Sequence, residues 1–135
     1  MLTVGISNEI TREVTKETTA AVLGSGMLEV YATPAMVALM EETCMKSVQA
    51  EMEEGCGTVG TGLTIHHKAA TPVGMKVRCV SKLVEVDGRK LVFDVQAFDE
   101  AGLIGQGTHE RFIIENDKFF QKASKKLESK QVSNS

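Results

Sequence analysis

The sequence is poor in aromatic residues, proline and long apolar runs. It has no tryptophan, one tyrosine and two prolines, and aromatic residues make up 4% of its 135 positions. The longest uncharged apolar run, residues 32–40, has nine residues, whereas about 20 are needed to cross a bilayer. The first residues carry no basic leader. We therefore expect no membrane association and no cleaved secretory signal.

Charge is unevenly distributed along the chain. The net charge is −3, but residues 1–115 carry 10 basic and 16 acidic side chains, while residues 116–135 carry 5 lysines and 2 acids. An acidic body argues against nucleic acid as a partner. The basic end is either a solvated helix or a surface that steers a phosphorylated ligand. The length predicts one domain, placed at residues 1–120, with a polar, partly helical or disordered tail at 121–135.

The three cysteines form no recognisable framework. Cys44, Cys56 and Cys79 are an odd number without a CxxC pair, which fits neither a disulfide scaffold nor a common zinc motif. Cys44 and Cys79 are expected to be buried, whereas Cys56 lies in a glycine-rich turn. We expect a reducing, cytoplasmic setting, with no metal and no cofactor.

Periodicity and turn residues predict one strand, one long helix and then four strands. Thr33 is expected to cap the helix, with Pro34 at its first position, and the helix should run towards Met52. Asp87-Gly88 predicts a tight hairpin. The expected strands are residues 9–16, 58–69, 75–86, 90–98 and 103–114, with a short terminal helix over 116–130.

A helix and a sheet both need cover for their apolar faces, so the long helix should pack across the sheet. The expected class is α+β. The expected architecture is the hotdog fold, in which an antiparallel curved sheet, with a meander of about four strands, wraps around one long central helix. The open edge of such a sheet favours pairing with a second copy.

One acidic side chain interrupts the apolar face of the long helix. Glu41 shares a stripe with three apolar residues spaced at helical intervals, which are Val37, Cys44 and Val48. An isolated buried carboxylate is costly, so it needs a partner or stays protonated. Glu41 is therefore a candidate catalytic group. The alternatives are a place at the wet margin of the stripe, or a structural pair with Arg111 or Lys68.

A histidine is expected to face this helix. Strict alternation places Val59, Leu63, Ile65 and His67 on one face of their strand and Thr58, Thr64 and His66 on the other. His67 could then exchange a proton with a carboxylate near neutral pH, unless it is a hydrogen-bonded core residue. His109, which shares its face with two glycines and Arg111, is expected to make a structural or interface contact.

Two further groups could stabilise negative charge. Thr33 is explained as a helix cap, but its hydroxyl also lies at the helix N-terminus, where anionic charge is favoured. Gly60 lies in a glycine-rich stretch that matches no phosphate-binding loop. A strand glycine can expose its N–H to a ligand carbonyl, as in an oxyanion hole.

Three motifs together resemble one family. They are VYATPAMVALME at residues 30–41, Gly60 followed seven residues later by His67, and GTHER at residues 107–111. Over about residues 5–120 the chain resembles the fluoroacetyl-CoA thioesterase-like family of the hotdog superfamily. The resemblance implies hydrolysis of an acyl-CoA by a homodimer, with a tetramer as an open alternative, and with sites near the subunit interface.

The resemblance also implies individual roles. Thr33, Glu41 and His67 match the family's catalytic residues. Gly60 matches the glycine whose N–H faces the thioester carbonyl, and Arg111 matches an arginine that positions the substrate. Glu41 would either attack the carbonyl directly or activate water.

One departure from the family concerns the acyl group. The fluoroacetyl-specific enzyme covers its acyl pocket with phenylalanines in the loop before the catalytic threonine, whereas residues 24–28 here read GSGML. A short- or medium-chain acyl group other than fluoroacetyl is therefore expected. The alternatives to a thioesterase are a hotdog dehydratase or isomerase, and a non-catalytic acyl-CoA-binding module.

Overall fold

The computed structural model describes the backbone of residues 1–133 and the side chains of residues 1–128. The part of the expected tail at residues 134–135 lies outside the described residues. The elements are β1 (Ser7–Glu13), η1 (Lys16–Thr18), α1 (Ala20–Leu23), α2 (Thr33–Gln49), β2 (Cys56–His67), β3 (Lys76–Asp87), β4 (Lys90–Phe98), β5 (Leu103–Glu115) and α3 (Asn116–Ser133).

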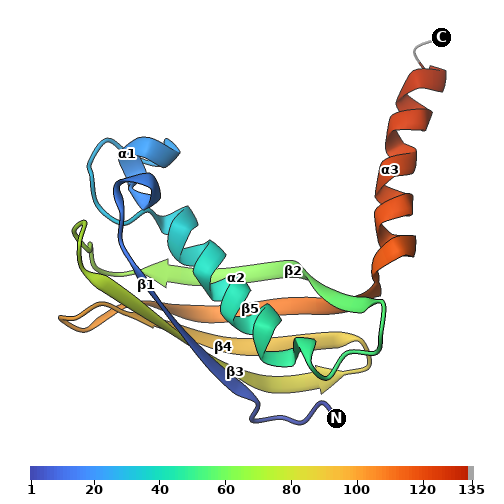
Figure 1. Ribbon diagram of the computed structural model, residues 1–135, viewed down its shortest axis with the longest axis horizontal. Helices are drawn as coiled ribbons and strands as arrows, with labels where there is room; N and C mark the ends of the chain where they lie inside the picture. Colours follow the sequence, from blue (N-terminus) through green and yellow to red (C-terminus); the bar gives the residue numbers. More distant parts are fainter. Residues whose placement is uncertain (134–135) are drawn as a thin grey trace.

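Five antiparallel strands form one curved sheet in the order β1-β3-β4-β5-β2, and α2 lies across one face of it (Figure 1). The expected meander is right for β3, β4 and β5. It is wrong for β2, because this strand follows α2 across the sheet and pairs with β5 at the far edge. Consequently β1 and β2 are the two edge strands.

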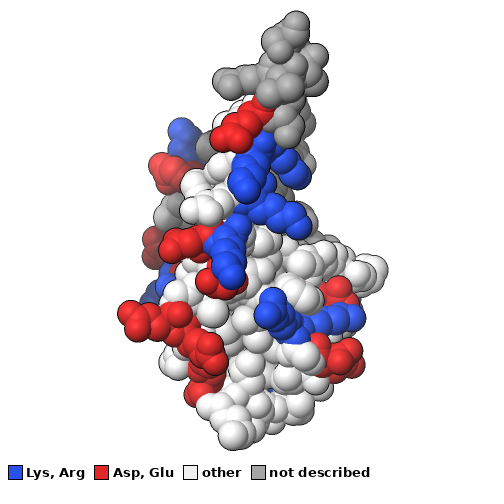
Figure 2. All heavy atoms as spheres, turned by 90° about the vertical axis from the view of Figure 1, so that its right-hand side faces the viewer, with Lys and Arg blue, Asp and Glu red and all other residues white. Residues whose placement is uncertain are grey.

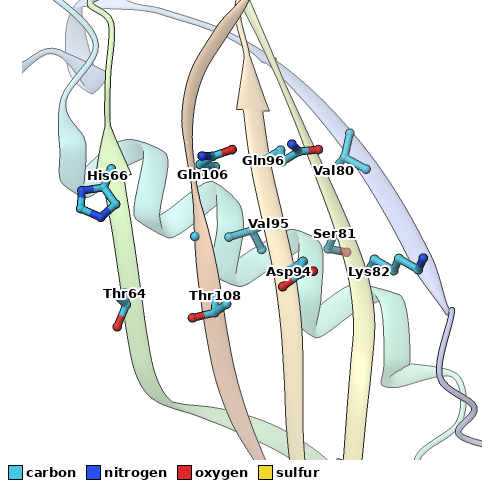
Figure 3. Close-up of a pocket in the computed structure, with 11 residues that line it drawn as sticks. Thr64, His66, Val80, Ser81, Lys82, Asp94, Val95, Gln96, Gln106 and Thr108 are labelled. Carbon is cyan, nitrogen blue, oxygen red and sulfur yellow. The ribbon is translucent and has the colours of Figure 1, made fainter.

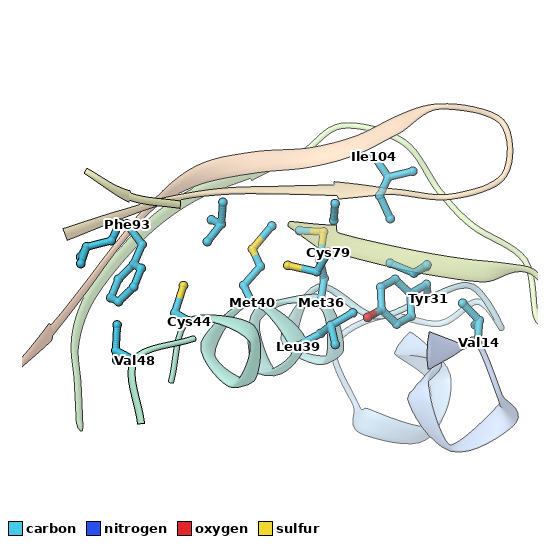
Figure 4. Close-up of a cluster of buried hydrophobic side chains, with 14 of the residues drawn as sticks. Val14, Tyr31, Met36, Leu39, Met40, Cys44, Val48, Cys79, Phe93 and Ile104 are labelled. Atoms are coloured by element: carbon cyan, nitrogen blue, oxygen red, sulfur yellow. The ribbon is translucent and has the colours of Figure 1, made fainter. Parts of the chain in front are cut away.

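The hydrophobic core lies between α2 and the sheet (Figure 4). Each large apolar side chain buried there stabilises the fold by about 1.5–3 kcal/mol relative to its exposure. The helix contributes Met36, Leu39, Met40, Cys44 and Val48, and the sheet contributes Val77, Cys79, Leu83, Leu91, Phe93 and Val95. The expectation that Cys44 and Cys79 are buried is confirmed. Glu41 lies beside this stripe and not within it, since its side chain is 44% exposed.

The start of α2 differs from the expectation. The N-cap is Ala32, which makes no side-chain cap hydrogen bond, and Thr33 is the first helical residue. Pro34 is in the first turn, where a missing N–H costs no helical hydrogen bond. The prediction that Thr33 caps the helix is therefore wrong. Its hydroxyl is available for another partner.

A β-bulge in β2 changes which residues face the helix. The pairing of β2 with β5 shifts register between Gly60 and Gly62, so Thr61 is left over. One extra residue reverses the alternation on either side of it. Thr58 is consequently on the face of α2, where its hydroxyl accepts from Arg111 Nε at 2.8 Å, and the prediction that it faces away is wrong.

Other boundaries lie close to the expected ones. The Asp87-Gly88 hairpin joins β3 to β4, with Gly88 at φ +60°. The first strand ends at Glu13, three residues earlier than predicted, and α2 ends at Gln49, before Met52. The division of the chain at residue 120 stays a prediction. Across residues 1–133, no helix is long and apolar enough to span a membrane.

Candidate active site

The first functional contact joins the start of α2 to the end of β2. Thr33 Oγ1 lies 2.7 Å from His67 Nδ1. Sequence analysis predicted both residues, and the absence of a capping role for Thr33 explains why its hydroxyl reaches the imidazole. The rings of His67 and Tyr31 are nearly perpendicular, with centroids 6.5 Å apart.

Burial favours the neutral form of His67. Desolvation on burial lowers the pKa of its imidazole below the usual 6.5. Its Nε2 is buried and has no hydrogen-bond partner among the described residues. A buried ring nitrogen without a partner costs free energy, so the single chain leaves the hydrogen bonding of His67 incomplete at Nε2.

The second functional contact surrounds Gly60. A Cβ atom added to Gly60 would lie 2.8 Å from Glu41 Oε2 and 3.5 Å from Arg111 Nη1. Arg111 Nη1 is itself 3.9 Å from Glu41 Oε2, with the guanidinium buried and the carboxylate half-exposed. The carboxylate therefore lies directly over the backbone of Gly60, at the margin that sequence analysis named as an alternative, with Arg111 as its partner.

Arg111 is fixed by a buried network. Its Nη2 donates to the Thr58 carbonyl at 2.8 Å, and its Nη1 lies 3.1 Å from His109 Nε2. His109 Nδ1 is 2.8 Å from the Gly62 carbonyl. Since arginine can only donate, Nε2 accepts and Nδ1 carries the proton to Gly62. Burial lowers the pKa of His109, which suits this neutral tautomer.

The hydrogen bonds of this network hold the backbone on both sides of the bulge, at Thr58 and Gly62. The sequence did not predict the role of His109 in it. Alternation put this histidine on one face with two glycines and Arg111 without saying which face that is, and the structure shows His109 to be 1% exposed. Its partner is a backbone carbonyl on another strand. No sequence motif marks such a carbonyl, so the role could not be assigned from the residue pattern.

Within one chain the two contacts lie apart. Thr33 and Glu41 are eight residues apart on α2, which at 1.5 Å per residue is about 12 Å along the helix axis. No contact between Glu41 and His67 occurs among the described residues. The single chain therefore does not bring Glu41 to His67, and it presents a Thr33–His67 pair and a Glu41–Gly60–Arg111 cluster along the same edge of the sheet.

Two hollows flank these groups. One of about 260 Å³ opens at the Thr33–His67 pair, and its walls include Ala20, Ser25 and Lys68. A larger one of about 610 Å³ lies on the face of the sheet away from α2 and is lined by polar side chains such as His66 and Lys82 (Figure 3). Only the smaller hollow touches the predicted site residues. In the described part of the chain, no group of three or more His, Cys, Asp or Glu could hold a metal ion.

The known proteins that this chain resembles include thioesterases. The sequence model of the fluoroacetyl-CoA-specific thioesterase family matches residues 14–117. The fluoroacetyl-CoA thioesterase of Streptantibioticus cattleyicolor is 43% identical over 98 residues, which cover 73% of this chain and 70% of that protein.

Solved structures give the same result. A solved structure of the fluoroacetyl-CoA thioesterase has a TM-score of 0.89 at 36% identity, and the match covers 93% of this chain and 98% of that chain. A thioesterase superfamily member from Thermus thermophilus has a TM-score of 0.86 at 30% identity, with 96% and 98% covered. The hotdog fold expected from the sequence is confirmed. This chain thus belongs to the fluoroacetyl-CoA-specific thioesterase family of hotdog proteins and is a thioester hydrolase.

Proposed function

We propose that the protein hydrolyses a short- or medium-chain acyl-CoA at sites shared between the two subunits of a homodimer. The observation that carries this proposal is the separation of two half-sites on one chain. Thr33 and His67 lie at one end of β2, and Glu41 lies over Gly60 nearer the other end. Neither half alone holds both an acid–base imidazole and a carboxylate.

Edge pairing of β2 would bring the halves together. β2 has β5 on one side and no strand on the other among the described residues, and an unpaired edge is a template for another chain. Residues opposite each other in antiparallel strands share a face. A two-fold axis near Thr64 would therefore place His67 of one copy beside Thr61 and Gly60 of the other, next to Glu41.

In this arrangement the backbone N–H at Gly60 polarises the thioester carbonyl, and the single Thr33 hydroxyl proton is donated either to that carbonyl or to His67 Nδ1. Glu41 either takes a proton from water, whose oxygen bonds to the carbonyl carbon, or attacks that carbon itself to give an anhydride that water then opens. In the first route the carbon–sulfur bond breaks and His67 relays the proton that Glu41 took from water to the departing thiolate. In the second route the thiolate departs as the anhydride forms, and the water that opens the anhydride supplies the proton. The products are a carboxylic acid and CoA. Arg111 holds the Glu41 carboxylate over Gly60.

The segment before α2 supports an acyl group other than fluoroacetyl. It has no phenylalanine, and Met27 and Leu28 are 93% and 69% exposed in the single chain. Ser25 of this segment lines the hollow at Thr33 and His67. The acyl end of the site is thus bordered by small and flexible residues. The three free thiols suit a cytoplasmic setting.

Subunit complementation tests both the acyl-CoA hydrolysis and the sharing of each active site between two subunits. Glu41→Gln and His67→Gln are purified separately and mixed one to one under conditions that allow subunit exchange, and CoA thiol release is measured. In a heterodimer, one site would receive both intact residues and the other neither. Random exchange should thus restore about a quarter of wild-type activity, because half the dimers each hold one complete site of two.

A matched control uses two variants from the same half-site. Mixing Thr33→Val with His67→Gln should restore nothing, because every heterodimeric site lacks one of the two groups. Restoration in the control but not in the test pair would contradict the sharing of sites. If the wild-type protein releases no thiol from acyl-CoA esters of two to ten carbons, the proposed substrate class is wrong.

A further inference from the structure

The C-terminal helix is poorly covered by its own chain. α3 continues directly from β5, and its principal contact is with that strand. Figure 1 shows it projecting from the body of the fold, past the edge formed by β2. At 1.5 Å per residue, its 18 residues extend about 27 Å. An isolated helix of this length is marginal in water and is normally stabilised by packing of one face.

α3 has an apolar face that lacks a cover. Phe119, Phe120, Ala123 and Leu127 follow one another at helical spacing and form what we call the α3 stripe. Three of them are 45%, 73% and 68% exposed, namely Phe119, Phe120 and Leu127. Lysines among residues 118–126 of α3 lie alongside the stripe, as the blue side chains on the projecting helix in Figure 2 show. An exposed apolar patch of this kind marks an interaction surface.

A second exposed apolar patch lies at the other end of β2. Val22 and Leu23 of α1, with Met27 and Leu28 after it, are 48–93% exposed. We call residues 22–28 the α1 segment. α1 and the smaller hollow lie at the His67 end of β2, whereas α3 starts at the Cys56 end, because Cys56 pairs with Glu115. Within one chain the α3 stripe and the α1 segment therefore lie at opposite ends of β2 and cannot pack against each other.

In a dimer, the α3 stripe of one subunit can contact the α1 segment of the other. With two β2 strands paired antiparallel about Thr64, Cys56 of one copy lies opposite the chain near Pro72 of the other. Pro72 forms a β-bridge with Val30, which leads directly back to Leu28. The start of α3 on one subunit would thus lie next to the α1 segment of the other.

We propose that α3 of each subunit packs its stripe on the α1 segment of its partner and forms part of the wall at the acyl end of the partner's site. This inference rests on the β2-paired dimer of the proposed function. Charge supports the choice of a second copy, because residues 1–115 carry a net charge of 10 − 16 = −6 and residues 116–135 a net of 5 − 2 = +3. Exposed Glu29 follows the α1 segment immediately.

Two matched double variants test the proposal in the full-length protein. Phe120→Glu with Leu127→Glu places two charges on the stripe, and Gln121→Glu with Ser124→Glu places the same two charges on another side of α3. Dimer dissociation is measured by analytical ultracentrifugation over a dilution series. The stripe variant should dissociate at least tenfold more readily than wild type, while the control should stay within about threefold. Far-UV circular dichroism checks that the hotdog fold is retained.

Activity and membrane binding give independent readouts. The stripe variant should lose activity on dilution at concentrations where the control keeps it, because each site needs two subunits. The proposal would be overturned if both variants and the wild type dissociate equally. It would also be overturned if the wild type cosediments with anionic phosphatidylserine vesicles and the stripe variant does not. These results would leave the complementation result untouched. If the wild-type protein is monomeric at all concentrations, both the proposed α3 contact and the proposed β2-paired dimer are wrong.

Discussion

Thr33 Oγ1 and His67 Nδ1 are 2.7 Å apart, across 34 residues of sequence. When the hydroxyl donates, Nδ1 accepts and the neutral ring carries its proton on Nε2. That proton then lies on a nitrogen that is buried in the single chain and has no hydrogen-bond partner among the described residues. A donating Thr33 hydroxyl thus favours the tautomer whose Nε2–H can donate a hydrogen bond.

Removing this hydroxyl should lower the rate of hydrolysis. Thr33→Val keeps the shape of the side chain but neither orients His67 nor helps to polarise the carbonyl. We expect kcat to fall by about 10²-fold, as for loss of an oxyanion donor. Thr33→Ser keeps the hydroxyl and should stay within about tenfold of wild type. Steady-state thiol release with both variants decides the matter, and equal rates for them would exclude a role for the hydroxyl.

Glu41→Gln should abolish most activity and leave the fold intact. The side chain is 44% exposed and outside the core, so its amide costs little stability, but it neither attacks nor accepts a proton. The expected loss is about 10²–10⁴-fold in kcat. Glu42→Gln is the control, because Glu42 pairs with Arg12 and Lys46 on the outer side of α2. Single-turnover hydrolysis in ¹⁸O water separates the two routes, since label enters Glu41 only after direct attack.

Gly60→Ala should damage the site through a single methyl group. The added Cβ would lie 2.8 Å from Glu41 Oε2, so the carboxylate must move away from the bulge. We expect about a tenfold or greater loss of kcat, since a misplacement of about 1 Å can cost 10²-fold. Gly62→Ala is the matched control in the same bulge, because its Cβ meets only the side chain of Glu110. If both variants retain wild-type kcat, the carboxylate does not act at this position.

Arg111→Met should destabilise the protein more than the same change at the surface. Arg111 is 6% exposed, and its loss leaves His109 Nε2 and the Thr58 carbonyl without their donors. An unsatisfied buried polar group costs about 1–3 kcal/mol of unfolding free energy. Arg12→Met removes an exposed ion pair with Glu42 and should cost at most about 1 kcal/mol. Urea unfolding of both variants provides the comparison, and equal losses would contradict the structural role of Arg111.

Stability should decrease as the pH falls below about 6.5. Burial lowers the pKa values of His67 and His109 in the folded state. The unfolded chain therefore binds more protons between the folded and unfolded pKa values, and the unfolding free energy rises with pH over that interval. The contribution is complete above 6.5 and is lost as pH falls to the folded pKa. Urea midpoints measured from pH 5 to 8 should show this slope, and His109→Gln should reduce it.

The candidate site residues could be identified from the sequence alone. Helical spacing singled out Glu41 as the acid on an apolar stripe, although the structure places it beside that stripe, and alternation placed His67 on the inner face. The Asp87-Gly88 hairpin and the burial of Cys44 followed from local rules as well. These features depend on residues close in sequence, whose geometry is set by 3.6-residue and two-residue periods.

Tertiary structure decided how these residues meet. The bulge that turns Thr58 inward comes from the pairing of β2 with β5, and the position of β2 at the sheet edge comes from the path of the chain across α2. Both set the separation of Thr33 and His67 from Glu41. Sequence periodicity describes one element at a time, so it fixes which side chains are available. Their distances depend on strand pairing and packing between segments far apart in the chain, which only the folded structure specifies.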